Sequence, residues 1–151
     1  MLKSSGPVVL VADDDPFILR TLTRCFSRHG VRVLAAQTAE SAEHILETEQ
    51  VSHLLCDYDF GPGQPTGAEL IPEWREGYPS IVVACIYTGS VLDHIPHGVD
   101  AVLQKPARAD ELFAALGLPV EEQASRRRRA VRQKEETVGP GAKHVLAARR
   151  K

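Results

Sequence analysis

Short apolar runs alternate along the chain with segments in which apolar residues recur every three or four positions. The runs are typical of strands buried between two layers, and the periodic segments are typical of amphipathic helices. The pattern predicts strands over 7–12, 31–36, 52–56, 81–86 and 99–103. It predicts helices over 16–29, 39–49, 68–77 and 110–117, and only a helix fragment over 90–98, which Pro96 and Gly98 interrupt.

Two of the predicted helices carry clear start signals. Asp15 precedes Pro16, which joins a preferred N-cap residue to the residue best tolerated at the first helical position. Thr38 is placed to cap the second helix. Asp15 therefore has a structural role, whereas Asp13 and Asp14, at the end of the first strand, have none.

Strands that alternate with helices indicate a parallel sheet covered on both faces, which is a three-layer α/β fold. In such a sheet the carboxyl ends of the strands lie along one edge, where open α/β proteins place their chemistry. Four of the five predicted strands deliver polar residues to that edge. These residues are Asp13, Asp14, Asp57, Thr88 and Lys105.

Each of these residues alone has an ordinary structural explanation, as a turn, a cap or a solvated loop charge. Together they suit phosphoryl transfer. Adjacent carboxylates repel each other unless a cation or proton lies between them, and Mg²⁺ prefers oxygen ligands such as carboxylates. With that cation, Asp57 is a candidate nucleophile towards phosphorus, and Lys105 and Thr88 would neutralise and position phosphoryl oxygens.

Four motifs in this order resemble one known family. VLVADDDP, LLCDYDFGPG, IYTGS and AVLQKP are similar to the receiver domain of bacterial two-component response regulators, and the resemblance covers residues 7–117. It implies a doubly wound, flavodoxin-like sheet of five parallel strands in the order 2-1-3-4-5. It also implies a function in phosphorelay signalling rather than catalytic turnover.

The resemblance implies a role for each site residue. Asp57 would be the phosphoacceptor, Thr88 the switch hydroxyl and Lys105 the cation that pairs with Asp57 or its phosphoryl group. Mg²⁺ would be bound directly by Asp14, with help from Asp13 and the acceptor. The backbone carbonyl of Asp59 would complete the metal site.

Three features depart from the family pattern. Val102 stands where the family usually has an aromatic switch residue, three positions before the lysine. The segment between Thr88 and Lys105 is shorter than usual, which implies a reduced fourth helix. The loop after Asp57 is longer and contains an added Gly-Pro-Gly. The first two departures make the family's usual output surface a poor assumption for this chain.

Composition narrows the class of protein. The 151 residues, 43% of them hydrophobic, are enough for one domain and a tail, and no apolar run approaches the roughly 18 residues of a membrane helix. Residues 1–7 lack the features of a signal peptide. The three scattered cysteines indicate reduced thiols rather than disulfides or a zinc site. We therefore expect a cytoplasmic protein without a membrane partner.

Charge divides the chain in two. Residues 1–117 contain 8 basic and 16 acidic residues, a net charge of -8, whereas residues 118–151 contain 10 and 4, a net charge of +6. We expect a receiver domain over 1–117 and a basic tail over 118–151, partly helical or disordered. The tail contains four consecutive arginines, at 126–129. Such a run can bind nucleic acid through phosphates, but the tail has no aromatic residue for stacking on bases, so a solvated tail is favoured.

Three interpretations of function remain open. The favoured one is a stand-alone receiver, phosphorylated on Asp57 by a histidine kinase or phosphotransfer protein and signalling by protein–protein contact, as a monomer or a phosphorylation-dependent homodimer. A DNA-binding regulator acting through the tail is the alternative, and a part of a larger hybrid protein is also open. The less favoured interpretation is a phosphatase of haloacid-dehalogenase type. The sequence Asp57-Tyr58-Asp59 resembles the nucleophile motif of that family. That family places its acidic pair after the lysine, whereas Asp13 and Asp14 precede the motif.

Overall fold

The structure is a computed structural model that describes residues 6–119. The predictions made for 120–151 lie outside the described residues. Strands and helices alternate along the described chain as the sequence predicted. In chain order the elements are β1 (Val8–Ala12), α1 (Pro16–Arg28), β2 (Arg32–Ala36), α2 (Ala39–Thr48), β3 (His53–Cys56), α3 (Gly67–Gly77), β4 (Val83–Thr88), β5 (Ala101–Gln104) and α4 (Ala109–Leu116).

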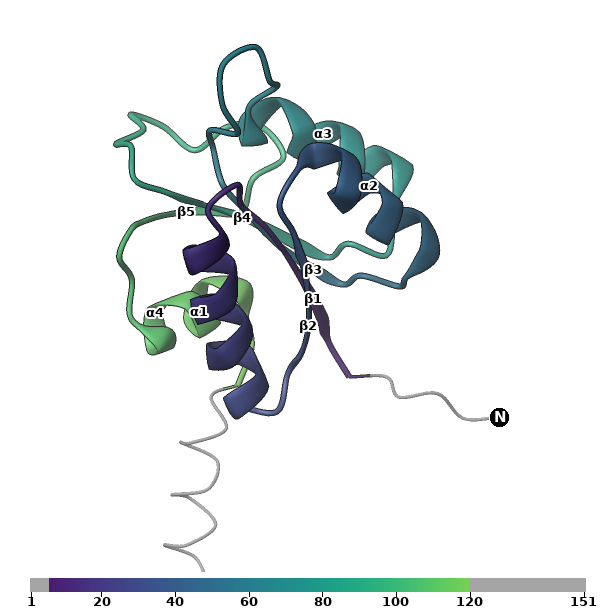
Figure 1. The fold of residues 1–151 in the computed structure, drawn as a ribbon, viewed down its shortest axis with the longest axis vertical. Helices are drawn as coiled ribbons and strands as arrows, with labels where there is room; N and C mark the ends of the chain where they lie inside the picture. Colours follow the sequence, from purple (N-terminus) through teal and green to yellow (C-terminus); the bar gives the residue numbers. More distant parts are fainter. Residues whose placement is uncertain (1–5, 120–151) are drawn as a thin grey trace, which may run out of the picture. The chain divides into compact units, whose positions relative to one another are not determined.

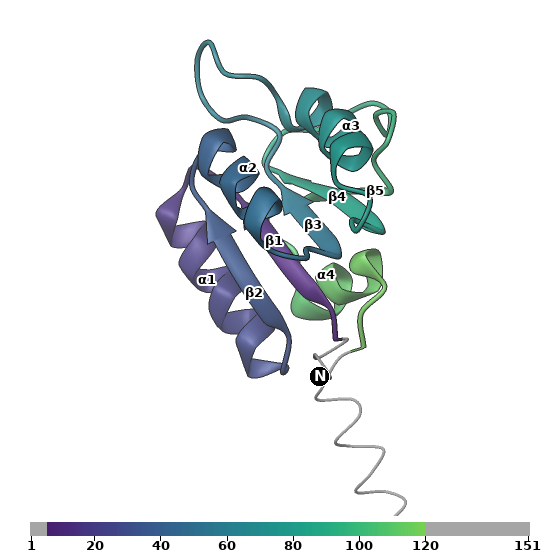
Figure 2. The same cartoon turned by 90° about the vertical axis from the view of Figure 1, so that its right-hand side faces the viewer.

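The five strands form one parallel sheet in the order β2-β1-β3-β4-β5. Leu10 of β1 pairs with Leu34 of β2 on one side and with Leu54 of β3 on the other. Helices α1 and α4 cover one face of the sheet, and α2 and α3 cover the other (Figures 1 and 2). The predicted three-layer fold and its strand order are therefore confirmed.

Apolar side chains fill both spaces between the sheet and its helices. Beneath α2 and α3, the wholly buried Leu54 and Ile86 of the sheet belong to one cluster with Ile71. On the other face, the rings of Phe26 from α1 and Phe113 from α4 lie 5.1 Å apart between centroids. Each such side chain contributes about 1.5–3 kcal/mol on burial, so both layers hold the strand ends in fixed positions.

The helix starts follow the local sequence. The Asp15 carboxylate accepts a hydrogen bond of 2.9 Å from the second residue of α1. Thr38 and Ser41 form a capping box at the start of α2, with 3.0 Å between the Ser41 nitrogen and Thr38 Oγ1. Both predicted caps are confirmed. A further box, Thr66 with Glu69, starts α3 and was not predicted.

Strand β4 begins two residues later than predicted and runs on to Thr88. Ile81 donates its N–H to Tyr78 within a turn, and Val82 donates to Ser52 while its side chain stays 59% exposed. The apolar run at 81–86 marked the region correctly. It could not mark the first paired residue, because the local turn uses the backbone of the leading residues.

Residues 90–98 form bends and a turn, so the predicted helix fragment is wrong. The predicted reduction of the fourth helix is confirmed, because an irregular segment takes its place. Pro96 has no backbone N–H to offer a helix, and Gly98 has a φ of 80°. Arg75 of α3 donates to the Gly98 carbonyl oxygen at 3.1 Å and pairs with Asp100 at 2.7 Å. These contacts anchor the segment to α3 in the place of helical hydrogen bonds.

Two expectations from composition can also be compared with the structure. Cys25, Cys56 and Cys85 are all free thiols, and the last two are buried, so the expectation of unpaired cysteines is confirmed. Within residues 6–119, no helix combines the length and the apolar character needed to cross a membrane.

Candidate functional site

The polar residues predicted at the strand ends gather at one edge of the sheet. Asp13, Asp57 and Thr88 are buried, with exposed fractions of 2%, 7% and 1%. The Asp57 backbone N–H donates to Ala12 at the end of β1, over 2.8 Å, and the Lys105 N–H donates to Thr88 at the end of β4, over 2.7 Å. Backbone hydrogen bonds thus link neighbouring strand ends, and they fix the Cα positions from which the side chains extend.

Three carboxylates converge at this edge. Asp13, Asp14 and Asp57 each offer one oxygen, and these oxygens lie within 4.8 Å of one another. Such a group is unfavourable without a cation, and an all-oxygen donor set is the kind that Mg²⁺ prefers. The Asp59 carboxylate points into its own loop, where it accepts a hydrogen bond of 2.9 Å from Gly61. The role expected of the Asp59 carbonyl oxygen stays a prediction.

Lys105 supplies the positive charge of the site. Its Nζ lies 2.8 Å from Asp13 Oδ2 and 3.5 Å from Asp57 Oδ1, so it bridges two of the three carboxylates. The same ammonium lies 5.6 Å from the centroid of the Tyr87 ring, within the range of a cation–π contact. The Tyr87 hydroxyl in turn accepts a hydrogen bond of 3.1 Å from the Ala107 backbone N–H.

Tyr87 was not predicted as part of the site. It lies on the side of the sheet that Thr88 does not face, because successive residues of a strand point to opposite faces. Its contact with Lys105 joins residues 18 positions apart, and no local pattern predicts such a contact. The only signal in the sequence was an aromatic residue next to the threonine at the end of a strand. Tyr87 thus holds the loop that follows Lys105.

The electrostatics of the site set two pKa values apart from their ordinary range. Burial, and then the charge of Asp13, raise the pKa of Asp57 from 3.8 to about 6, against the opposing effects of Lys105 and two backbone N–H groups. Burial lowers the pKa of Lys105, but the hydrogen bond and charge of Asp13 and the charge of Asp57 outweigh it, so the pKa is raised. Lys105 is therefore charged at neutral pH, and the pKa of Asp57 lies about one unit below neutral pH.

A close backbone approach holds Asp57 in place. Asp57 Oδ1 accepts a hydrogen bond of 2.8 Å from the Tyr58 N–H, and the Tyr58 carbonyl oxygen accepts one of 2.8 Å from Gly67 at the start of α3. A Cβ at Gly67 would overlap the Asp57 carbonyl oxygen. Glycine is therefore required here. The only sign of this requirement in the sequence was that Gly67 directly follows Thr66, a residue suited to begin a helix.

Thr88 ends β4, and Val102 lies on the neighbouring strand β5. Thr88 Oγ1 accepts a hydrogen bond of 3.0 Å from the Ser90 N–H. Val102 on β5 is half-buried and packs against the apolar cluster under α2 and α3. The switch role of Thr88 stays a prediction.

The chain matches the family model for the response regulator receiver domain over residues 9–117. Among curated proteins it is 29% identical over 117 residues to the alginate biosynthesis transcriptional regulatory protein AlgB of Pseudomonas putida, covering 75% of this chain and 26% of that protein. It is 32% identical over 127 residues to the hydrogenase transcriptional regulatory protein HoxA of Cupriavidus necator, covering 81% and 26%. The chain thus spans about a quarter of the length of these relatives.

Solved structures resemble the fold over most of the chain. A signal receiver domain of an HD domain-containing protein from Pseudomonas fluorescens aligns with a TM-score of 0.67 and 25% identity, covering 80% of this chain and 98% of that one. A response regulator from Burkholderia pseudomallei, solved with a phosphorylated aspartic acid and a calcium ion, aligns with a TM-score of 0.65 and 23% identity, covering 84% and 75%. With the family model spanning residues 9–117, the chain belongs to the response regulator receiver domain family.

Proposed function

We propose that Asp57 accepts a phosphoryl group from a histidine kinase or a phosphotransfer protein, and that the chain acts as a phosphorylation switch. One observation carries the proposal: the buried Asp57 lies close to two further carboxylates, and a lysine ammonium is 3.5 Å from it. A merely structural aspartate would not need this surplus of negative charge. The family, whose members generally serve as phosphoacceptors, supports the same chemistry.

The carboxylate group fits Mg²⁺. Its three oxygens lie close enough to share one ion, and two of the carboxylates are buried and so are held in place. Asp14 and Asp57 would bind the ion directly, and Asp13 would bind it directly or through water, with the Asp59 carbonyl oxygen as a further ligand. When bound, Mg²⁺ would neutralise charge on the phosphoryl oxygens during transfer. The phosphorylated aspartate and cation of the Burkholderia pseudomallei relative support this assignment.

The residues of the chain would carry the transfer as follows. An oxygen of the ionised Asp57 attacks phosphorus of a phosphohistidine, a P–O bond forms, and the P–N bond breaks with its electron pair moving to the imidazole nitrogen. Lys105 then pairs with the new phosphoryl oxygens instead of Asp57 and stabilises their negative charge. The Thr88 hydroxyl then hydrogen-bonds the phosphoryl group, which would favour the active member of a pre-existing pair of conformations.

Intact mass after incubation with acetyl phosphate and Mg²⁺ tests the proposal. We expect a hydroxylamine-labile phosphoryl adduct on the native chain and none on Asp57→Asn. Asp59→Asn is the matched control, because it removes an exposed carboxylate from the same loop and leaves the backbone carbonyl in place. An adduct that survives in Asp57→Asn would refute the assignment. Turnover of a phosphate ester that depends on the Asp59 side chain would favour the phosphatase reading instead.

The signal would leave the chain by protein–protein contact, in the cytoplasm. A second candidate output is DNA binding through the basic residues of the tail, since the curated relatives are named as transcriptional regulatory proteins. Deletion of residues 120–151 should abolish a salt-dependent DNA mobility shift if the tail carries that activity, because phosphate contacts release counterions. An unchanged shift, or no shift by the full chain, would rule out this candidate.

A further inference from the structure

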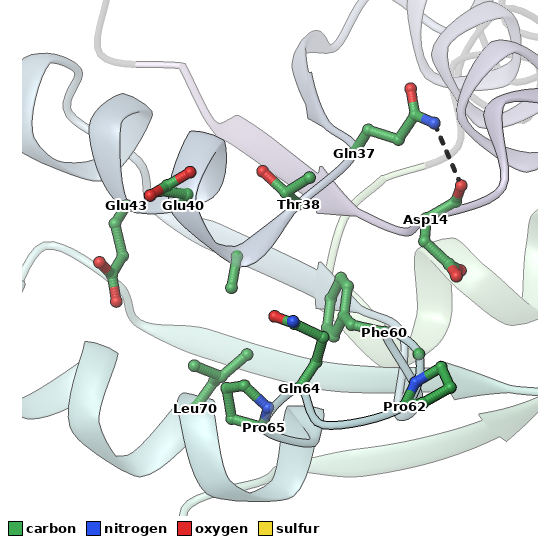
Figure 3. Close-up of a pocket in the computed structure, with 12 residues that line it drawn as sticks. Asp14, Gln37, Thr38, Glu40, Glu43, Phe60, Pro62, Gln64, Pro65 and Leu70 are labelled. Carbon is green, nitrogen blue, oxygen red and sulfur yellow. Dashed lines mark hydrogen bonds between the residues drawn. The ribbon is translucent and has the colours of Figure 1, made fainter.

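A groove of about 760 Å³ lies between α2 and the loop that joins β3 to α3, residues 58–66. We propose that this groove, here called the α2 groove, binds an arginine-bearing segment of a partner protein. Figure 3 shows its two walls, with Glu40 and Glu43 on α2 along one and Gln64, Pro65 and Leu70 along the other. Phe60 lies towards the end of the groove where Asp14 is found. The groove shares the exposed Asp14 with the candidate metal cluster but not the buried Asp13 and Asp57, so the inference does not depend on phosphorylation.

The loop wall of the α2 groove is built before any partner arrives. Asp59 Oδ1 accepts from the Gly61 N–H at 2.9 Å, and the Gly61 carbonyl oxygen accepts from Gln64 at 3.2 Å. Gly61 has a φ of 113°, a conformation that other residues rarely adopt, so this turn depends on glycine. Thr66 ends the loop by capping α3. A preformed wall lowers the entropic cost of binding.

The α2 wall is acidic. Glu40 and Glu43 are three residues apart on one helix and therefore neighbours on its surface. Within residues 6–119, neither forms an ion pair, and no lysine or arginine lines the groove. Glu43 is half-buried, with one oxygen accepting a hydrogen bond of 3.1 Å from the Trp74 indole, so its position is fixed. The charge that complements this wall is a cation.

A cationic side chain fits the wall better than a metal ion does. Among the described residues, the one group of three or more potential metal-ligating side chains is that of Asp13, Asp14 and Asp57. Glu40 and Glu43 give only two carboxylates, and the opposite wall adds one uncharged polar side chain, Gln64, beside Pro65 and Leu70. A metal ion would find a single amide oxygen on that side and no third carboxylate.

Arginine matches both walls at once. Its planar guanidinium can pair with carboxylates through two parallel hydrogen bonds and is less strongly hydrated than an ammonium group. Its three-carbon stem can cover the apolar wall made by Pro65 and Leu70. Lysine offers only a compact, strongly hydrated charge. Apolar residues on either side of the arginine would extend the contact along Phe60 and Pro62.

Trp74 provides a direct reporter for the test. It is the single tryptophan of the chain, and its indole N–H donates to Glu43, so one indole NMR signal reports on the acidic wall. The probe is the acetylated, amidated peptide Leu-Arg-Leu, added to the ¹⁵N-labelled full chain without Mg²⁺. We expect a saturable shift of the indole signal with a Kd of about 1 mM or below. The same peptide with citrulline, which keeps the shape of arginine without its charge, should not bind.

Two matched variants locate the binding. Glu40→Gln removes an exposed carboxylate of the wall and should weaken binding about tenfold, because a charged hydrogen-bond partner is lost. Glu47→Gln removes an exposed carboxylate from the same helix outside the groove and should change the Kd less than twofold. The α2 groove assignment is overturned by the absence of a saturable shift, by equal binding of the citrulline peptide, or by equal weakening in both variants.

Discussion

At the scale of single residues, burial gives Asp57 its chemistry. An exposed aspartate titrates near pH 3.8, but the loss of water around Asp57 and the charge of Asp13 raise its pKa to about 6. Two backbone N–H groups and Lys105 recover part of that cost. The site is therefore strained electrostatically when empty, and a cation or a phosphoryl group with its metal relieves the strain.

Replacing Asp57 by Asn should stabilise the metal-free protein at neutral pH. The folded-state pKa lies above the unfolded value, so the folded state binds more protons between about pH 4 and 6, and native stability falls as pH rises through that window. The difference corresponds to about 2–3 kcal/mol at pH 7 and to almost nothing at pH 4. Urea unfolding in EDTA at both pH values measures it.

Asp59→Asn is the control for this experiment, because Asp59 is exposed and lies in the same loop. It should change the free energy of unfolding at pH 7 by no more than about 0.5 kcal/mol. Adding Mg²⁺ should stabilise the native protein more than Asp57→Asn, since a ligand that binds the folded state adds to its stability. Equal stability of native and Asp57→Asn protein at pH 7 would contradict the role assigned to burial.

Sequence reasoning reached the site residues whose positions follow from the fold alone. Asp13, Asp57 and Thr88 each follow an apolar strand directly, so a parallel sheet was enough to bring them to one edge. Gly67 and Tyr87 were missed for a physical reason: their roles depend on contacts with the Asp57 carbonyl and the Lys105 ammonium. Such contacts join separate elements and leave no periodic pattern.

At the scale of elements, the predictions held where local chemistry decides. Helix α1 starts at the Asp15 cap as predicted, and α2 starts at its Thr38 box. The reduction of the fourth helix was predicted, but the irregular path of residues 90–98 was not, since the contacts that anchor it come from α3.

That anchor can be tested by removing Arg75. Its guanidinium donates to the Gly98 and Val82 carbonyl oxygens, each at 3.1 Å, and pairs with Asp100. Asp100 Oδ2 also accepts from the Ala84 N–H at 2.9 Å, so one cluster ties α3 to the start of β4 and to the end of the β4–β5 connection. Arg75→Met keeps most of the stem and should destabilise the protein by about 1–3 kcal/mol in urea unfolding.

Hydrogen exchange distinguishes an anchor from a general loss of stability. Relative to the native chain, Arg75→Met should accelerate amide exchange more in residues 89–100 than in the central strands. Arg32→Met breaks the exposed pair with Glu49 and should cost no more than about 0.5 kcal/mol. Similar costs for the two variants, or uniform exchange across the sheet, would show that Arg75 does not hold the segment.

At the scale of the whole molecule, the boundary along the sequence between the acidic part and the basic part falls near the end of α4. The sequence placed the boundary after Gly117, where the acidic part ends. The structure shows that Leu118 still belongs to the packed unit, since its side chain is only 8% exposed and its N–H donates to Phe113 at 2.8 Å. Composition could not detect this, because one apolar residue after a glycine leaves the charge balance unchanged.

A pair of fragments tests where the receiver ends. Residues 1–118 should fold and take a phosphoryl group from acetyl phosphate at the rate of the full chain, because every described contact of the site lies within them. Residues 1–117 should be less stable by about 1–2 kcal/mol, since burial of the Leu118 side chain and its backbone hydrogen bond are lost. Urea unfolding of both fragments measures the difference. Equal stability would place the boundary at Gly117, and slower phosphorylation of 1–118 would show that the basic tail contributes to the reaction.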